Sequence, residues 1–385
     1  MSAPLRILSV FGTRPEAIKM APVVHALNAE PGIDHSVCIT AQHREMLDSV
    51  LSVFNIQADI DLNVMAPNQG LNDIVAAVTT GLQPVLQRYQ PDRVLVHGDT
   101  TTTMATALAA YHARISVGHV EAGLRTGDRY APFPEEMNRR IADTLSDLHF
   151  APTATSRANL LAEGINDAGI HITGNTVIDA LLAASDLAKL DDSVRDLVTA
   201  AIGKPAPSQR LVLVTGHRRE NFGDGFENIC QALLRLATRD DVHVIYPVHL
   251  NPNVREPVFR LLGDHPRIRL IEPLSYLPFV ALMNRATIIV TDSGGIQEEA
   301  PALGKPVLVM RDTSERPEAI DSGTVKLVGT DPDTLVSECA TLLDNPDAYA
   351  TMSRAINPYG DGKAAQRITD ILMERPFEPW SPPPQ

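Results

Sequence analysis

The chain has 385 residues, of which 44% are hydrophobic, 21% charged and 4% aromatic. This balance is typical of a globular protein, so a disordered chain, a fibrous repeat and a small disulfide-stapled scaffold are excluded. At roughly 150 residues per domain, the length favours two domains. The 33 Lys and Arg residues against 47 Asp and Glu residues give a net charge of −14, which opposes nucleic acid and anionic membranes as partners.

The cysteine pattern and the N-terminal region bear on where the protein works. Three cysteines show no paired spacing, so neither a disulfide framework nor a zinc site is predicted: Cys38, Cys230 and Cys339. The apolar stretch Leu5 to Phe11 is interrupted by Arg6 and Ser9, which argues against a signal peptide. No window reaches the ~18 to 20 uninterrupted apolar residues of a membrane span. We expect a cytoplasmic protein without a metal or a membrane partner.

Short β-branched runs alternate with helical patterns along the chain. The predicted strands are, in chain order, Leu5–Val10, Ser36–Thr40, Arg93–His97, Ile115–Val120, Leu211–Thr215, Val242–Val248, Ile268–Ile271, Thr287–Thr291 and Pro306–Met310. Alternation of strands with helices predicts parallel sheets with crossover helices, and runs that are apolar on both faces indicate helices on both sides. The predicted fold is α/β, with two doubly wound, Rossmann-like domains.

The region between the two sets of strands predicts the domain organisation. A helical pattern over Thr176–Lys189 is followed by a Gly- and Pro-containing segment over Gly203–Ser208. We place the hinge near residues 170–175, with an N-terminal Rossmann-like domain over residues 1–172 and a second over residues 173–362. The remaining residues, 363–385, are expected to form a helix and a proline-rich tail.

In open α/β sheets, ligands bind outside the carboxyl ends of the strands, so the residues that follow each predicted strand are the candidates. After the first strand, Gly12, Thr13 and Pro15 favour a turn into a helix, with Arg14 and Lys19 nearby. Free N–H groups and two cations at this point predict an anion site, and a plain turn between a strand and a helix is the alternative.

Two carboxylates follow two successive strands. Asp99 could cap the next helix, but Thr100–Thr103 already offer caps, so Asp99 is a functional candidate. Glu121 ends the following strand, and neighbouring parallel strands lie about 4.8 Å apart. If the two strands are adjacent, both carboxylates can reach one ligand, and their proximity would separate their pKa values into an acid and a base. The alternative for Glu121 is a pair with Arg125.

A further acidic pair opens a helix after Pro134. Glu135 and Glu136 each precede an arginine by four positions, Arg139 and Arg140, and both could be ordinary surface pairs. Their place directly after Glu121 and a charged loop is the reason to keep Glu135 as a functional candidate.

In the second domain, His217 follows a strand and precedes two arginines, where an imidazole can exchange protons or bind phosphate. Ser293, Gly294 and Gly295 follow another strand and would present backbone N–H groups to a diphosphate. Glu299 lies about 9 Å further along the expected helix, where a carboxylate can bind a ribose diol, although acidic residues also suit the helix dipole alone. Arg316 could add a phosphate contact.

Two common nucleotide motifs are missing from the sequence. Neither G-x-G-x-x-G after the first strand nor G-x-x-x-x-G-K-[ST] occurs, which disfavours nicotinamide cofactors and triphosphate hydrolysis. No H-x-x-H or H-x-x-x-H cluster indicates a metal, so neither a cofactor nor a metal is predicted.

Six motifs in register, between about residues 6 and 370, resemble the non-hydrolysing UDP-N-acetylglucosamine 2-epimerases of bacteria. They lie at Gly12–Glu16, His97–Thr100, His119–Thr126, Pro134–Arg139, Gly216–Asn221 and Ser293–Pro301. The resemblance implies two domains of the glycosyltransferase B type facing a cleft, a UDP-sugar and UDP as ligands, a UDP-binding second domain, a C-terminal helix that returns to the first domain, and a homodimer.

The resemblance also implies an activity and a set of site residues. The family interconverts UDP-N-acetylglucosamine and UDP-N-acetylmannosamine, through anti elimination of UDP to 2-acetamidoglucal and syn readdition, and thereby feeds cell-surface polysaccharide synthesis. The matching catalytic residues are Asp99, Glu121, Glu135 and His217. The matching substrate-binding residues are Arg14, Lys19, Phe279, Ser293, Gly294, Gly295, Glu299 and Arg316, and those of an allosteric UDP-sugar site are Gln42, Arg218 and His249.

The sequence leaves some questions about the function open. Leu274 stands where many members carry glutamine, which affects the expected uracil contacts. A glycosyltransferase of the same architecture, an epimerase of a modified sugar such as a diacetamido uronate, and a catalytically silent nucleotide-sugar sensor are the alternatives.

Overall fold

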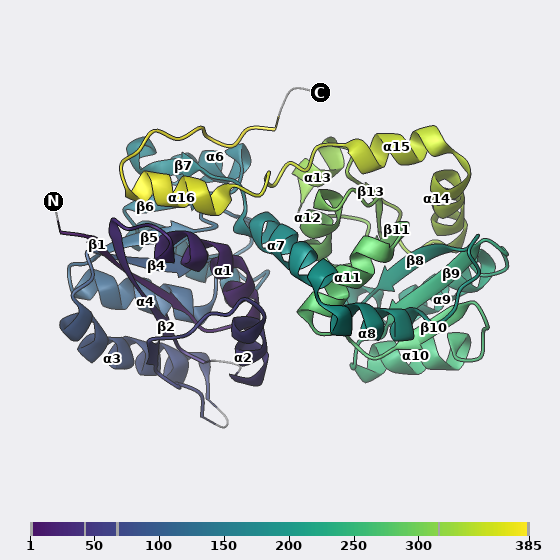
Figure 1. Ribbon diagram of the computed structural model, residues 1–385, viewed down its shortest axis with the longest axis horizontal. Helices are drawn as coiled ribbons and strands as arrows, with labels where there is room; N and C mark the ends of the chain where they lie inside the picture. Colours follow the sequence, from purple (N-terminus) through teal and green to yellow (C-terminus); the bar gives the residue numbers. More distant parts are fainter. Residues whose placement is uncertain (1–2, 42–43, 67–68, 315, 383–385) are drawn as a thin grey trace. The chain divides into compact units, whose positions relative to one another are not determined.

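The computed structural model describes residues 3–41, 44–66, 69–314 and 316–382. The chain divides into two compact units, which are described separately: unit 1, formed by residues 1–180 and 359–381, and unit 2, formed mainly by residues 181–358 (Figure 1). Each unit is built on a parallel sheet with helices between successive strands, so both are doubly wound and Rossmann-like, as predicted.

Unit 1 contains a sheet in the order β3-β2-β1-β4-β5-β6-β7. Its strands are β1 (Leu5–Phe11), β2 (Ile33–Ile39), β3 (Ile60–Asp61), β4 (Arg93–His97), β5 (Ser116–Val120), β6 (Leu148–Ala151) and β7 (Ile170–Ile172). Its helices are α1 (Arg14–Asn28), α2 (Arg44–Val53), α3 (Leu71–Tyr89), α4 (Thr101–His112), α5 (Glu135–Leu145), α6 (Ala154–Ala162), the 3₁₀ helix η1 (Asp167–Gly169) and α16 (Ala364–Leu372), with α7 (Thr176–Leu190) running from unit 1 into unit 2.

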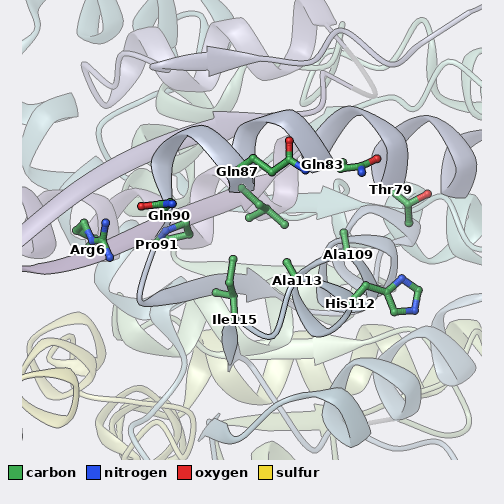
Figure 2. Close-up of a pocket in the computed structure, with 11 residues that line it drawn as sticks. Arg6, Thr79, Gln83, Gln87, Gln90, Pro91, Ala109, His112, Ala113 and Ile115 are labelled. Carbon is green, nitrogen blue, oxygen red and sulfur yellow. The ribbon is translucent and has the colours of Figure 1, made fainter.

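The direction of winding reverses between β1 and β4, which pair with each other although β2 and β3 lie between them in the chain. At such a switch point, the loops at the carboxyl ends of the two strands diverge and leave room for a ligand. A cavity of about 720 Å³ lies at the amino ends of the strands of this sheet, between α3 and α4 (Figure 2). None of its described lining residues is acidic, so it offers no carboxylate for acid–base chemistry.

The C-terminal helix α16 packs on α1 within unit 1. The buried carboxylate of Asp179, on α7, accepts the backbone N–H groups of Ala364 and Ala365 at 3.2 and 2.9 Å. These N–H groups have no partner inside α16, so Asp179 supplies the acceptor that the start of the helix needs. Beyond the helix, Arg375 pairs with Glu30 at 2.7 Å.

Unit 2 contains a sheet in the order β10-β9-β8-β11-β12-β13. Its strands are β8 (Arg210–Thr215), β9 (Val242–Pro247), β10 (Ile268–Ile271), β11 (Ile288–Thr291), β12 (Val307–Val309) and β13 (Val325–Leu327). Its helices are α8 (Asp192–Ile202), the 3₁₀ helix η2 (Arg219–Asn221), α9 (Asp224–Leu236), α10 (Pro252–Leu262), α11 (Tyr276–Arg285), α12 (Gly294–Ala302), α13 (Pro317–Asp321), α14 (Pro332–Asp344) and α15 (Pro346–Arg354).

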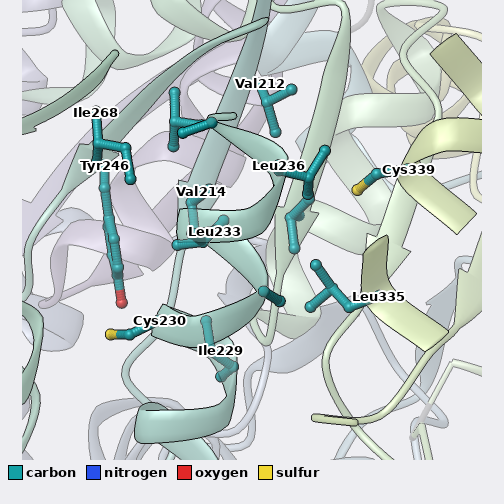
Figure 3. Close-up of a cluster of buried hydrophobic side chains, with 14 of the residues drawn as sticks. Val212, Val214, Ile229, Cys230, Leu233, Leu236, Tyr246, Ile268, Leu335 and Cys339 are labelled. Carbon is teal, nitrogen blue, oxygen red and sulfur yellow. The ribbon is translucent and has the colours of Figure 1, made fainter. Parts of the chain in front are cut away.

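The core of unit 2 is a continuous apolar cluster between the sheet and the helices α9 and α14 (Figure 3). Val212, Leu233 and Tyr246 are completely buried in it. Burial of a side chain as large as valine or leucine contributes roughly 1.5 to 3 kcal/mol, so this cluster holds the strand ends in fixed positions.

All nine predicted strands are present, with bounds that differ by three residues or fewer. The sequence patterns missed β3, β6, β7 and β13, which have two to four residues each. In the part of the chain that the structure describes, no helix combines the length and the apolar character that crossing a membrane requires.

Candidate active site

The carboxyl ends of β4 and β5 bring the first group of candidates together. The two strands are parallel neighbours, with His97 opposite Val120, so Asp99 and Glu121 follow adjacent strands, as the prediction required. Lys19, Asp99, Glu121 and Glu135 all line one cavity of about 420 Å³ in unit 1.

Glu121 is a buried carboxylate with two close donors. Its Oε2 atom accepts from the Lys19 ammonium at 2.5 Å and from the Asn175 amide at 2.8 Å. Burial alone would raise the pKa of Glu121, but the charge of Lys19 and the donors around the carboxylate lower this pKa to about 2. Glu121 is therefore ionised at neutral pH. The alternative pair with Arg125 is wrong, because that guanidinium bonds to Asp143 and Glu163.

Asp99 lies at the mouth of this cavity, with its side chain about one third exposed. Its carboxylate accepts from Arg139 at 2.9 Å, and its backbone carbonyl accepts from the Asn138 amide at 3.0 Å. The helix cap is Thr100, whose hydroxyl accepts the N–H of Thr103 at 3.1 Å. Asp99 is thus not used as a cap and faces the cavity.

Glu135 is the first residue of α5 and adds a third carboxylate to this cavity. Its Oε2 atom is buried and has no hydrogen-bond partner among the described residues. The surface pairs considered from the spacing are wrong: Arg139 pairs with Asp99 and, at 3.6 Å, with Glu136, whereas Arg140 pairs with Glu163. Glu135, which has one unpartnered carboxylate oxygen, therefore lines the same cavity as Asp99 and Glu121.

In unit 2, the turns after β8 and β11 are adjacent because these strands pair with Thr215 opposite Thr291. Asp292, which follows β11, is completely buried. Its carboxylate accepts the N–H groups of His217 and Arg218, both at 2.9 Å, and the amide of Asn221 at 3.3 Å. Asp292 therefore fixes the backbone of the turn that carries His217.

The His217 side chain is 41% exposed, and its Nδ1 atom lies 3.3 Å from Asp292 Oδ1. Its ring stacks on that of His249, with 5.6 Å between the ring centroids. Burial lowers the pKa of His217, and the Asp292 charge opposes this shift. A histidine with one nitrogen next to a carboxylate and an exposed side chain can exchange a proton or donate to an anion.

Ser293, Gly294 and Gly295 form the N-terminus of α12, and the Ser293 side chain makes no capping bond. The Arg218 guanidinium lies beside this turn, since a Cβ atom on Gly294 would be 3.6 Å from Arg218 Nη2. Helix N–H groups next to a guanidinium are a favourable place for a phosphate. His217 and the Ser293 turn thus belong to one surface of unit 2.

Comparison with known proteins assigns the family. A family model described as UDP-N-acetylglucosamine 2-epimerase matches residues 25–373. A protein of Escherichia coli O157:H7 named UDP-N-acetylglucosamine 2-epimerase is 60% identical over 369 residues, which cover 96% of this chain and 98% of that protein. The chain belongs to the UDP-N-acetylglucosamine 2-epimerase family. It is accordingly an enzyme of the isomerase class.

Solved structures show the same relationship. The UDP-GlcNAc 2-epimerase of Neisseria meningitidis, crystallised with UDP-GlcNAc, is 50% identical and superposes with a TM-score of 0.87 over 96% of this chain and all of that one. A Staphylococcus aureus MnaA structure with UDP is 46% identical, with a TM-score of 0.81 over 96% of each chain.

The other residues that the family resemblance indicated are placed as follows. Arg14 is partly exposed in the first turn of α1, and Phe279 and Glu299 are partly buried in α11 and α12. Arg316 precedes α13 and pairs with Glu298. Gln42 lies outside the described residues. Across the described ranges, no group of three or more His, Cys, Asp or Glu side chains is arranged to hold a metal ion.

Sequence reasoning missed a buried carboxylate, Glu16, beneath the turn after β1. It accepts the N–H groups of Gly12 and Thr13 at 3.1 and 2.8 Å, and the hydroxyls of Thr100 and Thr103 at 2.7 and 3.1 Å. Burial raises the pKa of Glu16, and these donors oppose the shift. Glu16 joins the turns after β1 and β4. The Thr13-x-x-Glu16 capping box was the available signal.

His119 was also missed as a supporting residue. It is completely buried, and its Nε2 lies 2.7 Å from the carbonyl oxygen of Gly98, while its Nδ1 lies 2.6 Å from Asp143 Oδ1. Because a carbonyl only accepts, Nε2 carries the hydrogen in this bond. The ring thereby fixes the Gly98 peptide directly before Asp99. Its place two residues before Glu121, at the start of the motif His119–Thr126, was the signal in the sequence.

Proposed function

We propose that this chain interconverts UDP-N-acetylglucosamine and UDP-N-acetylmannosamine by inverting the configuration at C2 of the sugar. The observation that carries the proposal is the group of three carboxylates on one cavity of unit 1: ionised Glu121, Asp99, and Glu135 with its unpartnered oxygen. Inversion at C2 requires one group that removes a proton from one face and another that delivers a proton to the opposite face.

The proposed reaction begins with elimination. A base removes the C2 proton as the bond between C1 and the UDP oxygen breaks, so the electron pair of the C–H bond forms the C1–C2 double bond of 2-acetamidoglucal. UDP then adds back to C1 while C2 receives a proton on the other face. Asp99, Glu121, Glu135 and His217 are the groups we assign to these proton transfers. The first three differ in exposure and donors, which supports different roles for chemically similar side chains.

UDP gains negative charge as it departs, and unit 2 offers groups that stabilise such charge. The N–H groups at the start of α12 and the neighbouring Arg218 lie on the same surface as His217. Donors held by the backbone need no rearrangement as charge develops, which makes them effective at this step. We assign the diphosphate to Ser293, Gly294 and Gly295, the ribose to Glu299, and the uracil to the region of Phe279.

Incubation of the full chain with UDP-N-acetylglucosamine, followed by proton NMR of the products, tests this proposal. We expect UDP-N-acetylmannosamine to accumulate to a constant ratio without an acceptor. Release of free N-acetylmannosamine and UDP would indicate a hydrolysing enzyme, and turnover only after an acceptor is added would indicate a glycosyltransferase. A parallel reaction with a UDP-diacetamido uronate distinguishes an epimerase of that modified sugar.

We also propose that the protein works in the cytoplasm as a homodimer and that its product feeds cell-surface polysaccharide synthesis. Support comes from the family assignment, in which the family model matches residues 25–373 and the Escherichia coli relative covers 96% of the chain. Light scattering coupled to gel filtration is expected to give about twice the 41.7 kDa mass of one chain. A mass equal to one chain would contradict the dimer.

A further inference from the structure

His97, the last residue of β4, is the one histidine among the described residues that line the 420 Å³ cavity with Glu121, and the proposed mechanism does not use it. It is 2% exposed, and neither of its ring nitrogens has a hydrogen-bond partner among the described residues. A buried polar group without a partner costs about 1 to 3 kcal/mol. Such a group on the wall of a cavity calls for a partner, and a ligand bound in the cavity would supply one.

The environment of the ring determines which hydrogen bonds it can make. Burial lowers the pKa of His97 to about 3, with Glu121 opposing this shift and Lys19 and His119 supporting it. The imidazole is therefore neutral at working pH and has one N–H donor and one acceptor nitrogen. A ring that stays neutral can orient a ligand group by hydrogen bonding, but it cannot act as a store for the transferred proton.

The position of Glu121 identifies the kind of ligand group. His97 Nε2 lies 3.9 Å from Glu121 Oε2, which is too long for a direct hydrogen bond. An oxygen placed at hydrogen-bond distance from both atoms would have to accept from the ring and donate to the carboxylate. A hydroxyl does both, whereas a carbonyl oxygen or a phosphate oxygen only accepts.

We propose that His97 is a further substrate-contacting residue, which donates through Nε2–H to a hydroxyl of the sugar while that hydroxyl donates to Glu121. The inference rests on the proposed function, since it assigns the sugar to this cavity. The bridge would hold the sugar ring in place next to the carboxylates and would not take part in proton transfer itself.

Three substitutions test the bridge. His97→Leu removes both nitrogens, His97→Gln places an amide nitrogen near the position of Nε2, and His97→Asn places one near Nδ1. We expect H97L to lower kcat/KM for UDP-N-acetylglucosamine roughly 10- to 100-fold and H97Q to recover to within about five-fold of the wild type. H97N should stay close to H97L. The exposed His112→Leu serves as a control for loss of a histidine and should keep wild-type kcat/KM.

UDP binding separates a local contact from general damage. Calorimetric titration with UDP should give affinities within about two-fold of the wild type for all three variants, because the proposed contact is to the sugar. The profile of kcat/KM between pH 6 and 9 should have the same shape in H97Q and in the wild type. If the acid or the basic limb of this pH profile is absent in H97Q, His97 ionises during the reaction, and the proposal is overturned.

Deoxy substrates identify the hydroxyl. The wild type should lose activity on one of the 3-, 4- and 6-deoxy analogues of UDP-N-acetylglucosamine, the one that lacks the bridging hydroxyl. On that analogue H97L should be little less active than the wild type, because the hydrogen bond that the substitution removes is already missing. Losses that multiply on every analogue would contradict the bridge. If H97L does not fold, the proposal is tested by comparing kcat/KM of H97Q with that of H97N. An H97N variant that is as active as H97Q, or more active, would overturn the proposal.

The outcomes also separate this inference from the proposed function. A wild-type protein that does not act on UDP-N-acetylglucosamine would refute the proposed function. An active wild type with H97L within about two-fold of it in kcat/KM would refute only the role of His97.

Discussion

Lys19 and Glu121 lie 102 positions apart in the sequence and form an ion pair of 2.5 Å in which only 7% of the Glu121 side chain is exposed. The carboxylate is thus charged in a place where burial favours its neutral form. Among the groups that lower the pKa of Glu121, which also include His97 and Asn175, Lys19 has the largest effect.

Replacing Lys19 with methionine should therefore change the pH dependence of the reaction. Without the ammonium, burial raises the pKa of Glu121, so the fraction of ionised carboxylate falls as the pH is lowered. We expect the acid limb of kcat/KM to move upward by at least about one pH unit in K19M. In K19R, which keeps the positive charge, the acid limb of kcat/KM should lie near the pH at which it lies in the wild type. An unshifted limb in K19M would show that Lys19 does not control Glu121.

Glu121→Gln tests whether the carboxylate itself is needed. The amide can still accept a hydrogen bond from Lys19 but cannot accept a proton from carbon at neutral pH. We expect turnover to fall by at least about 1000-fold, with UDP affinity and thermal midpoint close to those of the wild type. Activity within about ten-fold of the wild type would remove Glu121 from the catalytic set.

Asp292→Ala should destabilise unit 2. The buried carboxylate holds two backbone N–H groups and the Asn221 amide, all of which would lose their acceptor. We expect a loss of roughly 2 to 4 kcal/mol in urea unfolding, together with loss of turnover through the displaced His217. The exposed Asp196→Ala on α8 is the control and should change stability by less than about 0.5 kcal/mol. Equal effects of the two substitutions would contradict the role of Asp292.

The raised pKa of Asp179 predicts that the stability of the protein changes with pH. Burial raises its pKa from 3.8 to about 6, against the lowering effect of the α16 N–H groups. Because the folded-state pKa lies above the unfolded value, the stabilisation is present at low pH and is lost as the pH rises through 6. Relative to D179N, the wild type should lose about 2 to 3 kcal/mol of unfolding free energy between pH 4 and 7. A constant difference over this range would exclude a raised pKa.

The sequence predicted the strands that carry the site, and this explains why the candidates were found. Arg93–His97 was predicted to the residue, so Asp99 and the end of the next strand could be placed without a structure. The residues that bond to these carboxylates could not be placed, since Lys19 reaches Glu121 only through the packing of α1 on the sheet. Asp292 was passed over for the same reason, because it precedes the Ser-Gly-Gly turn in sequence but bonds to the turn after β8.

The spacing rule for helices gave the wrong partners for Arg139 and Arg140. A surface pair four residues apart contributes only about 0.3 to 0.5 kcal/mol. Contacts with Asp99 and Glu163 from other elements therefore prevail once the chain is folded. By contrast, the pentapeptide Arg-Pro-Glu-Ala-Ile, which occurs at residues 14–18 and again at 316–320, lies at the start of a helix both times, α1 and α13. Proline in the first turn and the acidic residue after it act locally.

In the proposed reaction, the enzyme removes the proton at C2 of the sugar and replaces it on the other face. The most direct measurement is incubation with UDP-N-acetylglucosamine in deuterium oxide, with the C2 position followed by NMR and mass spectrometry. We expect one deuterium at C2 in the manno product and its gradual appearance in the remaining substrate. A manno product that retains the original C2 hydrogen, or a substrate that stays unchanged while UDP binds, would contradict it.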